Sequence, residues 1–285
     1  MPAETPTATT RISADDARKA LVGLATEPGV SKPDPIVVVD GVRRTFGGLT
    51  AVDVDHVEIQ RGVITALIGP NGAGKTTFFN LLTGFDQPDQ GDWSFNGTSL
   101  KGVGAFKVAR MGMVRTFQLT KVLSKLSVLE NMRLGSTGQL GERFWAGPLK
   151  FLWRGQEVTN TERARELLAR FKLDKKEHDY AGSLSGGQRK LLEMARALMA
   201  DPELVMLDEF AAGMSRDETH YAVDLVRRLT EGKTVVLIEH DMDVVFSLAD
   251  RITVLHRGEI LATGTPTEIR HNQAVKDAYL GDLEV

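Results

Sequence analysis

The chain has 285 residues, of which 42% are hydrophobic and 26% are charged, and its formal net charge is −3. Such a composition is that of a folded globular protein, and the small negative charge gives no basic field that would attract nucleic acid. The sequence contains no cysteine, which excludes disulfides, cysteine-based zinc sites and thiol catalysis.

Residues 1–34 are rich in Ala, Thr and Pro, and we expect them to form an N-terminal extension. Ser13 is a good N-cap residue, and Asp15 and Asp16 fall in the first turn of a helix that is predicted to run to Ala25. The extension as a whole is expected to be mobile. It has no basic start followed by an apolar stretch, so export is not expected.

From residue 35 onward, short apolar runs alternate with helical patterns. Strands are predicted at 36–39, 54–59, 63–68, 114–117, 204–207, 234–238 and 252–255. Helices are predicted at 75–82, 161–171, 187–200, 216–229 and 242–249. This alternation predicts an α/β fold with a largely parallel sheet covered on both faces. The apolar runs are far shorter than the roughly 20 residues that cross a bilayer.

The most informative segment is a glycine-rich run with the pattern G-x-x-x-x-G-K-[ST], which lies between a predicted strand and a predicted helix. This phosphate loop consists of Gly69, Pro70, Asn71, Gly72, Ala73, Gly74, Lys75, Thr76 and Thr77. Glycines let backbone N–H groups wrap closely around phosphate, and the following helix adds its positive N-terminal end. Lys75 is expected to contact the β- and γ-phosphates, and the Thr76 hydroxyl to ligate Mg²⁺. The loop alone leaves kinases, GTPases and many ATPases open.

Two adjacent carboxylates, Asp208 and Glu209, follow the apolar run at 204–207. A strand that ends in a carboxylate beside a phosphate loop supplies a second contact for Mg²⁺. We expect Asp208 to hold the metal and Glu209 to take a proton from the attacking water. The plain alternative is a strand end with two solvated acids.

The pentapeptide Leu-Ser-Gly-Gly-Gln at 184–188 leads into another predicted helix. Ser185 is a good N-cap residue, and Gly186 and Gly187 clear space for close approach to an anion. The chain thus has two helix starts that suit phosphate although it needs one nucleotide, so the second would serve a nucleotide bound by a partner. In isolation the segment could also be an ordinary helix cap. In this position, ending in Gln188, it resembles the signature of the ABC ATPase family.

Three further residues match elements of that family in the expected order. Gln118 resembles the glutamine of the Q-loop, which contacts metal and water and senses the transporter. His240 follows the strand at 234–238 and resembles the switch histidine that hydrogen-bonds the γ-phosphate. Phe46 lies where the family stacks an aromatic ring on adenine, although packing in the core is the competing interpretation.

The resemblance implies a P-loop NTPase of the ABC type over residues 35–285. Such a fold has a mixed, mainly parallel sheet, an antiparallel β subdomain and a helical signature subdomain at about 119–200. The resemblance also implies a two-fold dimer with ATP bound between the phosphate loop of one chain and the signature of the other. Hydrolysis, with water aligned by Glu209, Gln118 and His240, would open this dimer.

Most of the chain, from about residue 35 to 281, resembles the ATP-binding subunits of bacterial importers of branched-chain (hydrophobic) amino acids. The segments that carry the resemblance are 46–52, 68–80, 82–84, 114–118, 129–132, 238–242, 264–266 and 278–281. The resemblance implies a peripheral ATPase on the cytoplasmic face of the cell membrane, with membrane permease subunits and a second ATP-binding subunit. An extracytoplasmic solute-binding protein would take part indirectly. The C-terminal ending is also typical of urea and short-amide importers.

Two residues depart from the family pattern. Phe210 stands after the catalytic acid where the family usually has proline, and Ser215 stands where it usually has Asn or Asp. Because proline fixes φ, Phe210 is expected to relax the backbone that aims Glu209. We predict intact ATP binding and slower hydrolysis.

Aromatic residues gather between 138 and 159, namely Phe144, Trp145, Phe151 and Trp153. They either pack inside the helical subdomain or form a docking surface for a membrane subunit. Three rival functions also remain open: a non-transport ABC ATPase acting on DNA or the ribosome, a regulatory nucleotide sensor with weak turnover, and an exporter ATPase. The region of Gln118, the single cassette and the acidic balance favour transport.

Overall fold

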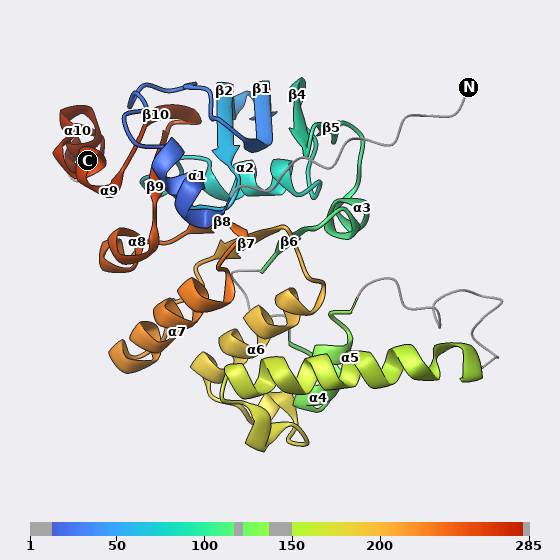
Figure 1. The fold of residues 1–285 in the computed structure, drawn as a ribbon. Helices are drawn as coiled ribbons and strands as arrows, with labels where there is room; N and C mark the ends of the chain where they lie inside the picture. The colour runs from blue at the N-terminus through green and yellow to red at the C-terminus, as the bar shows by residue number, and fades with distance from the viewer. Residues whose placement is uncertain (1–12, 117–121, 137–149, 282–285) are drawn as a thin grey trace, which may run out of the picture.

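The computed structural model describes residues 13–116, 122–136 and 150–281, and its strands form two sheets (Figure 1). The four-stranded sheet has the order β2-β1-β4-β5 and is antiparallel. The six-stranded sheet has the order β10-β9-β3-β8-β7-β6 and is parallel except for the β9–β10 pair. The strands are β1 (Pro35–Phe46), β2 (Leu49–Gln60), β3 (Ile64–Ile68), β4 (Gln90–Phe95), β5 (Thr98–Ser99), β6 (Met113–Arg115), β7 (Leu204–Asp208), β8 (Thr234–Ile238), β9 (Arg251–His256) and β10 (Glu259–Gly264).

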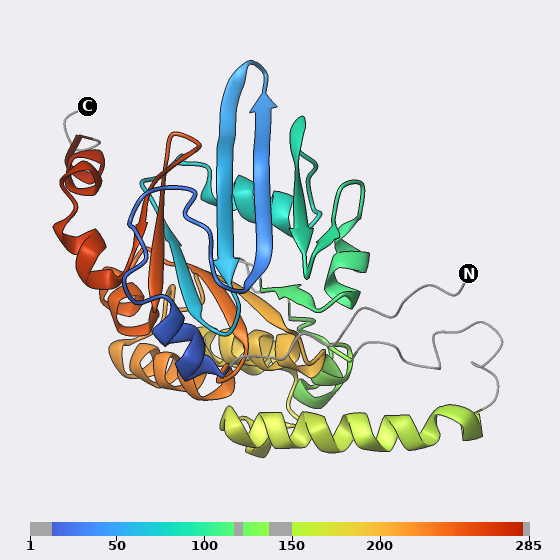
Figure 2. The ribbon, with the colours of Figure 1, turned by 45° about the horizontal axis from the view of Figure 1, so that its top comes forward.

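The helices divide into those that cover the sheets and a separate helical group. They are α1 (Ala14–Ala20), α2 (Lys75–Leu82), α3 (Ala105–Arg110), α4 (Val128–Arg133), α5 (Lys150–Arg170), α6 (Gly186–Met199), α7 (Arg216–Leu229), α8 (Met242–Leu248), α9 (Pro266–His271) and α10 (Gln273–Gly281), with 3-10 turns η2 (Asp174–Lys176) and η3 (Ala181–Ser183). Figures 1 and 2 show α4, α5 and α6 together, on the side opposite the β1–β2 hairpin. No helix in the described part of the chain combines the length and the apolar composition that a bilayer crossing requires.

Strands β7 and β8 are buried along their whole length, and their side chains alternate between two cores. Val205, Leu207 and Leu237 pack in one core with residues of α6, α7 and α8. Met206 and Val236 pack in the other core with residues of α2 and the antiparallel sheet. A parallel strand that is buried on both faces reads as a continuous apolar run. The prediction of a parallel sheet covered on both faces is therefore confirmed.

The predicted elements differ from the observed ones in extent, and several observed elements were not predicted. The ranges 75–82, 216–229 and 234–238 have the observed bounds. Pattern analysis missed the strands β4, β5 and β10 and the helices α3, α4, α9 and α10. These short elements have neither a continuous apolar run, as β7 and β8 do, nor enough positions for a helical period to repeat. The helix predicted at 161–171 begins at Lys150 instead, because Gly155 and the polar residues after it obscure its pattern. The boundary of the helical subdomain at about 119–200 stays a prediction.

The described part of the N-terminal extension packs on the domain through α1 and the residue that follows it. Ala17 is fully buried and clusters with Leu21 and Val63. The prediction that its helix continues to Ala25 is wrong, because α1 ends at Ala20 and Gly23 has a φ of +81° that turns the chain out of the helix. The mobility of residues 1–34 stays a prediction.

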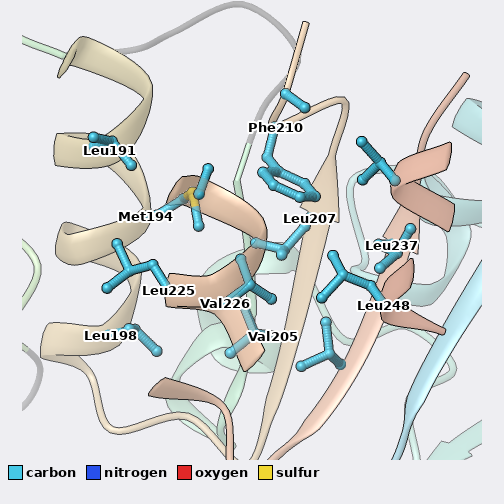
Figure 3. Packing of buried hydrophobic residues seen from close by; sticks show 14 of the residues in the cluster. Leu191, Met194, Leu198, Val205, Leu207, Phe210, Leu225, Val226, Leu237 and Leu248 are labelled. Atoms are coloured by element: carbon cyan, nitrogen blue, oxygen red, sulfur yellow. The ribbon is translucent and has the colours of Figure 1, made fainter. Parts of the chain in front are cut away.

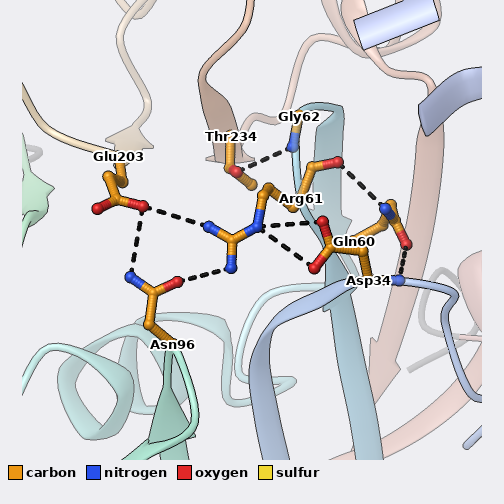
Figure 4. A network of polar contacts seen from close by, with 7 residues as sticks. All are labelled: Asp34, Gln60, Arg61, Gly62, Asn96, Glu203 and Thr234. Carbon is orange, nitrogen blue, oxygen red and sulfur yellow. Dashed lines mark hydrogen bonds and ion pairs between the residues drawn. The ribbon is translucent and has the colours of Figure 1, made fainter. Parts of the chain in front are cut away.

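A polar network joins several elements at the amino end of the parallel strands (Figure 4). The Arg61 guanidinium donates to Asp34 at 3.2 Å, to Glu203 at 3.2 Å and to Asn96 at 2.7 Å. Asn96 also donates to Glu203 at 3.4 Å. Glu203 lies just before β7, and Asp34 just before β1. The network therefore ties the antiparallel sheet to the amino end of the six-stranded sheet.

Candidate functional site

The phosphate loop connects the carboxyl end of β3 to the start of α2, and its backbone conformation needs glycine at two points. Gly69 has a φ of +157° and Gly74 a φ of +103°. A Cβ at Gly69 would lie 2.0 Å from the Leu255 carbonyl oxygen, and one at Gly74 would lie 2.2 Å from that of Ala51. Because backbone lies on the other side of each contact, no larger residue fits without moving β9 or β2.

Lys75 occupies the first position of α2 and is 7% exposed. Its Nζ donates to the carbonyl oxygens of Gly69 at 2.6 Å and of Pro70 at 2.9 Å. Burial lowers the pKa of Lys75, and the negative charges of Glu209 and Asp208 partly oppose this shift. The cation is thus held inside the loop, with two carboxylates close by.

A cavity of about 700 Å³ opens beside this loop, a size that suits a nucleotide. Its walls are formed by Leu49, Thr50, Ala51, Asn71, Gly72, Ala73, Gly74, Lys75, Thr76, Thr77, Glu209, Ile238, His240 and Arg257. Most of the predicted phosphate loop and two predicted catalytic residues are therefore brought together around one space. Sequence reasoning missed Arg257, which lies in the β9–β10 turn with a φ of +50°.

Phe46 is not among the described residues that line this cavity. Its side chain is 48% exposed, so packing in the core does not account for it. The Arg44 guanidinium lies 4.6 Å from the centroid of the Phe46 ring, which covers part of the ring by a cation–π contact. The exposed ring at the end of β1 remains able to meet a flat base at the edge of the site.

Asp208 ends β7 and is 3% exposed. Its Oδ2 accepts a hydrogen bond from the Arg115 guanidinium at 2.7 Å, and Arg115 also donates to Asn80 at 2.6 Å. The Asp208 backbone N–H donates to the Thr116 hydroxyl at 3.3 Å. Sequence reasoning missed Arg115 and Asn80, although both lie in the segments that carry the family resemblance. This buried pair orients the carboxylate that was predicted to hold a metal.

Glu209 and His240 come from the ends of neighbouring strands, and His240 Nε2 lies 3.0 Å from Glu209 Oε1. The Glu209 side chain is 16% exposed, and that of His240 is 50% exposed. Both residues line the cavity. The predicted base and the predicted switch histidine therefore form one hydrogen-bonded pair that faces the phosphate loop.

Glu239, which sequence reasoning did not single out as a site residue, lies between this histidine and the end of β8. It is 4% exposed, and its Oε1 accepts from the Ala211 backbone N–H at 2.9 Å. Burial raises the pKa of Glu239 to about 7, while the Ala211 hydrogen bond and the Lys190 charge act in the opposite direction. In the sequence, Glu239 could have been identified as an acid that directly follows a buried apolar strand.

The signature segment forms a capping box at the start of α6. The Ser185 hydroxyl accepts from the Gln188 N–H at 3.2 Å, and the Gln188 side chain accepts from the Ser185 N–H at 3.1 Å. Ser185 and Gly186 are exposed. Gly187 is buried, and a Cβ there would lie 2.6 Å from a carboxylate oxygen of Glu218 on α7, so a larger residue would displace the end of that side chain. Among the described residues, none of 185–188 lines the cavity of the same chain.

The two residues that depart from the family pattern have structural roles. Phe210 is 2% exposed and packs in a core with Leu191, Met194 and Leu207 (Figure 3). Ser215 is the N-cap of α7, where its hydroxyl accepts from the Glu218 N–H at 3.3 Å. Gln118, Phe144 and Trp145 lie outside the described residues, as do the side chains of Phe151 and Trp153.

Comparisons with known proteins agree with this geometry. A family model described as "ABC transporter" matches residues 52–212, and one described as "Branched-chain amino acid ATP-binding cassette transporter" matches residues 259–284. The chain is 41% identical over 251 residues to the high-affinity branched-chain amino acid transport ATP-binding proteins LivG of Salmonella typhimurium and BraF of Pseudomonas aeruginosa. Each match covers 87% of this chain and 98% of the relative.

Solved structures give the same result at the level of the fold. The chain is similar to a nucleotide-free ATP-binding cassette from an ABC transporter, with a TM-score of 0.74 and 32% identity over 86% of this chain and 98% of that one. It is also similar to the ADP conformation of an ATP-binding cassette of an ABC transporter, with a TM-score of 0.72 and 31% identity. That match covers 87% of this chain and 99% of the other.

Proposed function

Because the chain belongs to the ABC transporter family, we propose that it is the ATP-hydrolysing subunit of an importer of branched-chain or other hydrophobic amino acids. The observation that carries the hydrolytic role is the Glu209–His240 pair, 3.0 Å apart, at the wall of a cavity formed by the phosphate loop. The amino-acid class rests on the LivG and BraF relatives and on the C-terminal match at 259–284.

ATP is held in this proposal by the phosphate loop, residues 69–77. Backbone N–H groups of the loop and the N-terminal end of α2 attract the phosphates. Lys75 exchanges its two carbonyl contacts for the β- and γ-phosphate oxygens, since a phosphate offers this buried cation a stronger, charged acceptor. Phe46 stacks on adenine from the end of β1.

Mg²⁺ fits the oxygen donors that Thr76 and Asp208 supply. The Thr76 hydroxyl lies at the start of α2, and Asp208 is oriented by Arg115. Gln118 completes the set by resemblance to the family. When bound, the ion would neutralise charge on the β- and γ-phosphates.

Hydrolysis follows from the placement of Glu209 and His240. Glu209 accepts the proton of the attacking water, and His240, whose Nε2 meets the Glu209 carboxylate in this structure, donates a ring N–H to the γ-phosphate of bound ATP. The signature, Ser185 through Gln188, supports a partner role because Ser185 and Gly186 are exposed and lie away from the cavity of their own chain. In the proposed dimer these groups bind the γ-phosphate held by a second ATP-binding subunit.

The remaining partners follow from the transporter assignment. We place the chain at the cytoplasmic face of the cell membrane, as a peripheral subunit bound to membrane permease subunits. An extracytoplasmic solute-binding protein delivers the amino acid to those permease subunits. Nucleic acid is not a partner in this proposal, and the net charge of −3 supports that expectation.

The hydrolytic part is tested with Glu209→Gln, which keeps the shape of the side chain and removes the base. With ATP and Mg²⁺ the variant should accumulate as a nucleotide-bound dimer, seen as a doubled mass by size exclusion with light scattering. Adding Lys75→Ala to the same chain should abolish the dimer, since the nucleotide is then no longer held. A variant that stays monomeric with bound ATP would contradict the proposed site between two chains.

The substrate class is tested by uptake in cells that lack the endogenous chain. Cells that express the wild-type chain should take up labelled leucine, isoleucine and valine, and cells that express Lys75→Ala should not. Labelled urea serves as the contrasting solute. Uptake of urea without uptake of any branched-chain amino acid would overturn the amino-acid assignment and favour the short-amide class.

A further inference from the structure

The backbone of Glu209 has a conformation that is unfavourable for any residue other than glycine. Its φ is +49°, in the left-handed region where the Cβ of an L residue crowds the following carbonyl oxygen. Such a conformation persists only where surrounding contacts fix it. Because Glu209 is the proposed base, the contacts that fix its backbone also decide where its carboxylate points.

Backbone hydrogen bonds supply part of this restraint. The Glu209 N–H donates to the Ile238 carbonyl oxygen at 2.9 Å, which continues the pairing of β7 with β8. The Ala212 N–H donates to the Glu209 carbonyl oxygen at 3.3 Å and closes a tight turn. These contacts hold the start and the end of the turn at 209–212.

Two side chains from other elements hold the same turn. Lys190, on α6, donates from Nζ to the Glu209 carbonyl oxygen at 2.5 Å. Glu239, at the end of β8, accepts the Ala211 N–H at 2.9 Å in a buried position. Lys190 also acts electrostatically on Glu239. The turn is therefore fixed from the signature helix on one side and from β8 on the other.

Glu239 is well placed to do more than satisfy a backbone group. Its neighbour in sequence is His240, whose Nε2 lies 3.0 Å from Glu209 Oε1. One short segment thus carries both the carboxylate that fixes the turn and the histidine that meets the base. Burying an acid is unfavourable, as the raised pKa of Glu239 indicates.

We propose that Glu239 is a positioning residue of ATP hydrolysis, whose carboxylate fixes the turn after β7 and thereby sets Glu209 against His240, with Lys190 as the second fixing contact. The proposal rests on the assignment of Glu209 as the base. It connects the signature helix to the base through Lys190, so that displacement of α6 would move the Glu209 carbonyl group directly.

The test compares Glu239→Leu, which removes the acceptor, with Glu239→Gln, which keeps an oxygen that can accept from Ala211. Steady-state ATP hydrolysis is measured for the full-length chain with Mg²⁺, together with ATP affinity. Glu239→Leu should lower kcat by about 10- to 100-fold and leave KM within about two-fold, since only the base is misplaced. Glu239→Gln should recover most of kcat.

Glu203→Leu is the matched control, because Glu203 is a carboxylate at the opposite end of β7. It should change thermal stability and leave kcat unchanged. If Glu239→Leu does not fold, kcat and KM are measured for Lys190→Met, which removes the donor to the Glu209 carbonyl oxygen. The same fall in kcat at constant KM is expected. A double variant Glu239→Leu/Lys190→Met should show non-additive losses, since both residues fix one turn.

The proposal is overturned if Glu239→Leu keeps wild-type kcat, if kcat and ATP affinity fall in parallel, or if Glu239→Gln is no better than Glu239→Leu. Steady-state ATP hydrolysis of Glu209→Gln is measured together with that of the Glu239 variants. Normal turnover of Glu209→Gln would refute the base assignment itself. Loss of turnover in Glu209→Gln combined with normal turnover in Glu239→Leu would refute the positioning role alone.

Discussion

The two ends of the parallel strands use polar groups in different ways. At the amino end, Arg61 is paired with Asp34 and Glu203 in a network of side chains that also includes Asn96, whose φ is +49° (Figure 4). At the carboxyl end, the phosphate loop and Glu209 have positive φ values. There, Lys75 is buried and its pKa is lowered.

The difference shows which polar groups serve the fold and which serve the reaction. Groups at the amino end satisfy one another, so their removal should reduce stability and spare turnover. Groups at the carboxyl end are held by backbone geometry and face a cavity. Their removal should reduce turnover more than stability, as is typical of sites that store strain.

The largest expected effect is that of Lys75→Ala at the carboxyl end. Loss of a charged donor to the β- and γ-phosphates should reduce kcat/KM by about a thousand-fold, equivalent to about 4 kcal/mol. The melting temperature without nucleotide should stay the same or rise, because a buried cation is removed. Steady-state kinetics and thermal unfolding measure the two quantities, and a variant with normal kcat/KM would remove Lys75 from the site.

Phe210→Ala should reduce both stability and turnover, because Phe210 belongs to the core and directly follows the base. Removing a ring that is 2% exposed should lower the free energy of unfolding by about 3 kcal/mol. Denaturant unfolding checks this loss, and a loss below about 1 kcal/mol would show that the ring is not packed as described.

Phe210→Pro addresses the separate prediction that Phe210 slows hydrolysis. Proline should fix the backbone after Glu209, and turnover should rise when it is measured at a temperature where the destabilised variant is still folded. Equal turnover of this variant and the wild type would contradict the prediction.

Arg61→Ala should give the reverse of the Lys75 result. It leaves Asp34 and Glu203 without their shared cation, and we expect a loss of about 2 kcal/mol in the free energy of unfolding. The value of kcat per folded chain should be unchanged. Arg61→Lys should recover little of the stability, since an ammonium group cannot match the fork of contacts that the guanidinium makes. A fall in kcat would show that the two ends of the sheet are coupled.

The smallest expected effect is a change in how stability depends on pH. The pKa of Glu239 is raised to about 7 in the fold, so between its unfolded pKa and about 7 the native state binds a proton that the unfolded state does not. This contribution to stability is present at low pH and is lost as pH rises through 7. Glu239→Gln should therefore gain about 1 kcal/mol relative to the wild type between pH 6 and pH 8. Parallel stability curves for the two chains would contradict the raised pKa.

Pattern and composition predicted those parts of the molecule in which the local sequence determines the outcome. The phosphate loop, its flanking strand and helix, and the acids after β7 follow from residue type and spacing, since only glycine fits at 69 and 74 and only a buried strand reads as a continuous apolar run. The capping box at Ser185 and Gln188 is likewise a local feature. These segments also carry the family resemblance.

Only the tertiary structure decided what these groups meet. The pairing of Arg115 with Asp208, the contact of Glu239 with Ala211 and the distance between His240 and Glu209 all join residues that lie in, or just after, different strands. A local pattern contains no information about such contacts, because they depend on which strands are neighbours and on how each strand ends. For the same reason, the sequence shows Phe210 only as a departure from the family motif. The fold shows that Phe210 is part of the core.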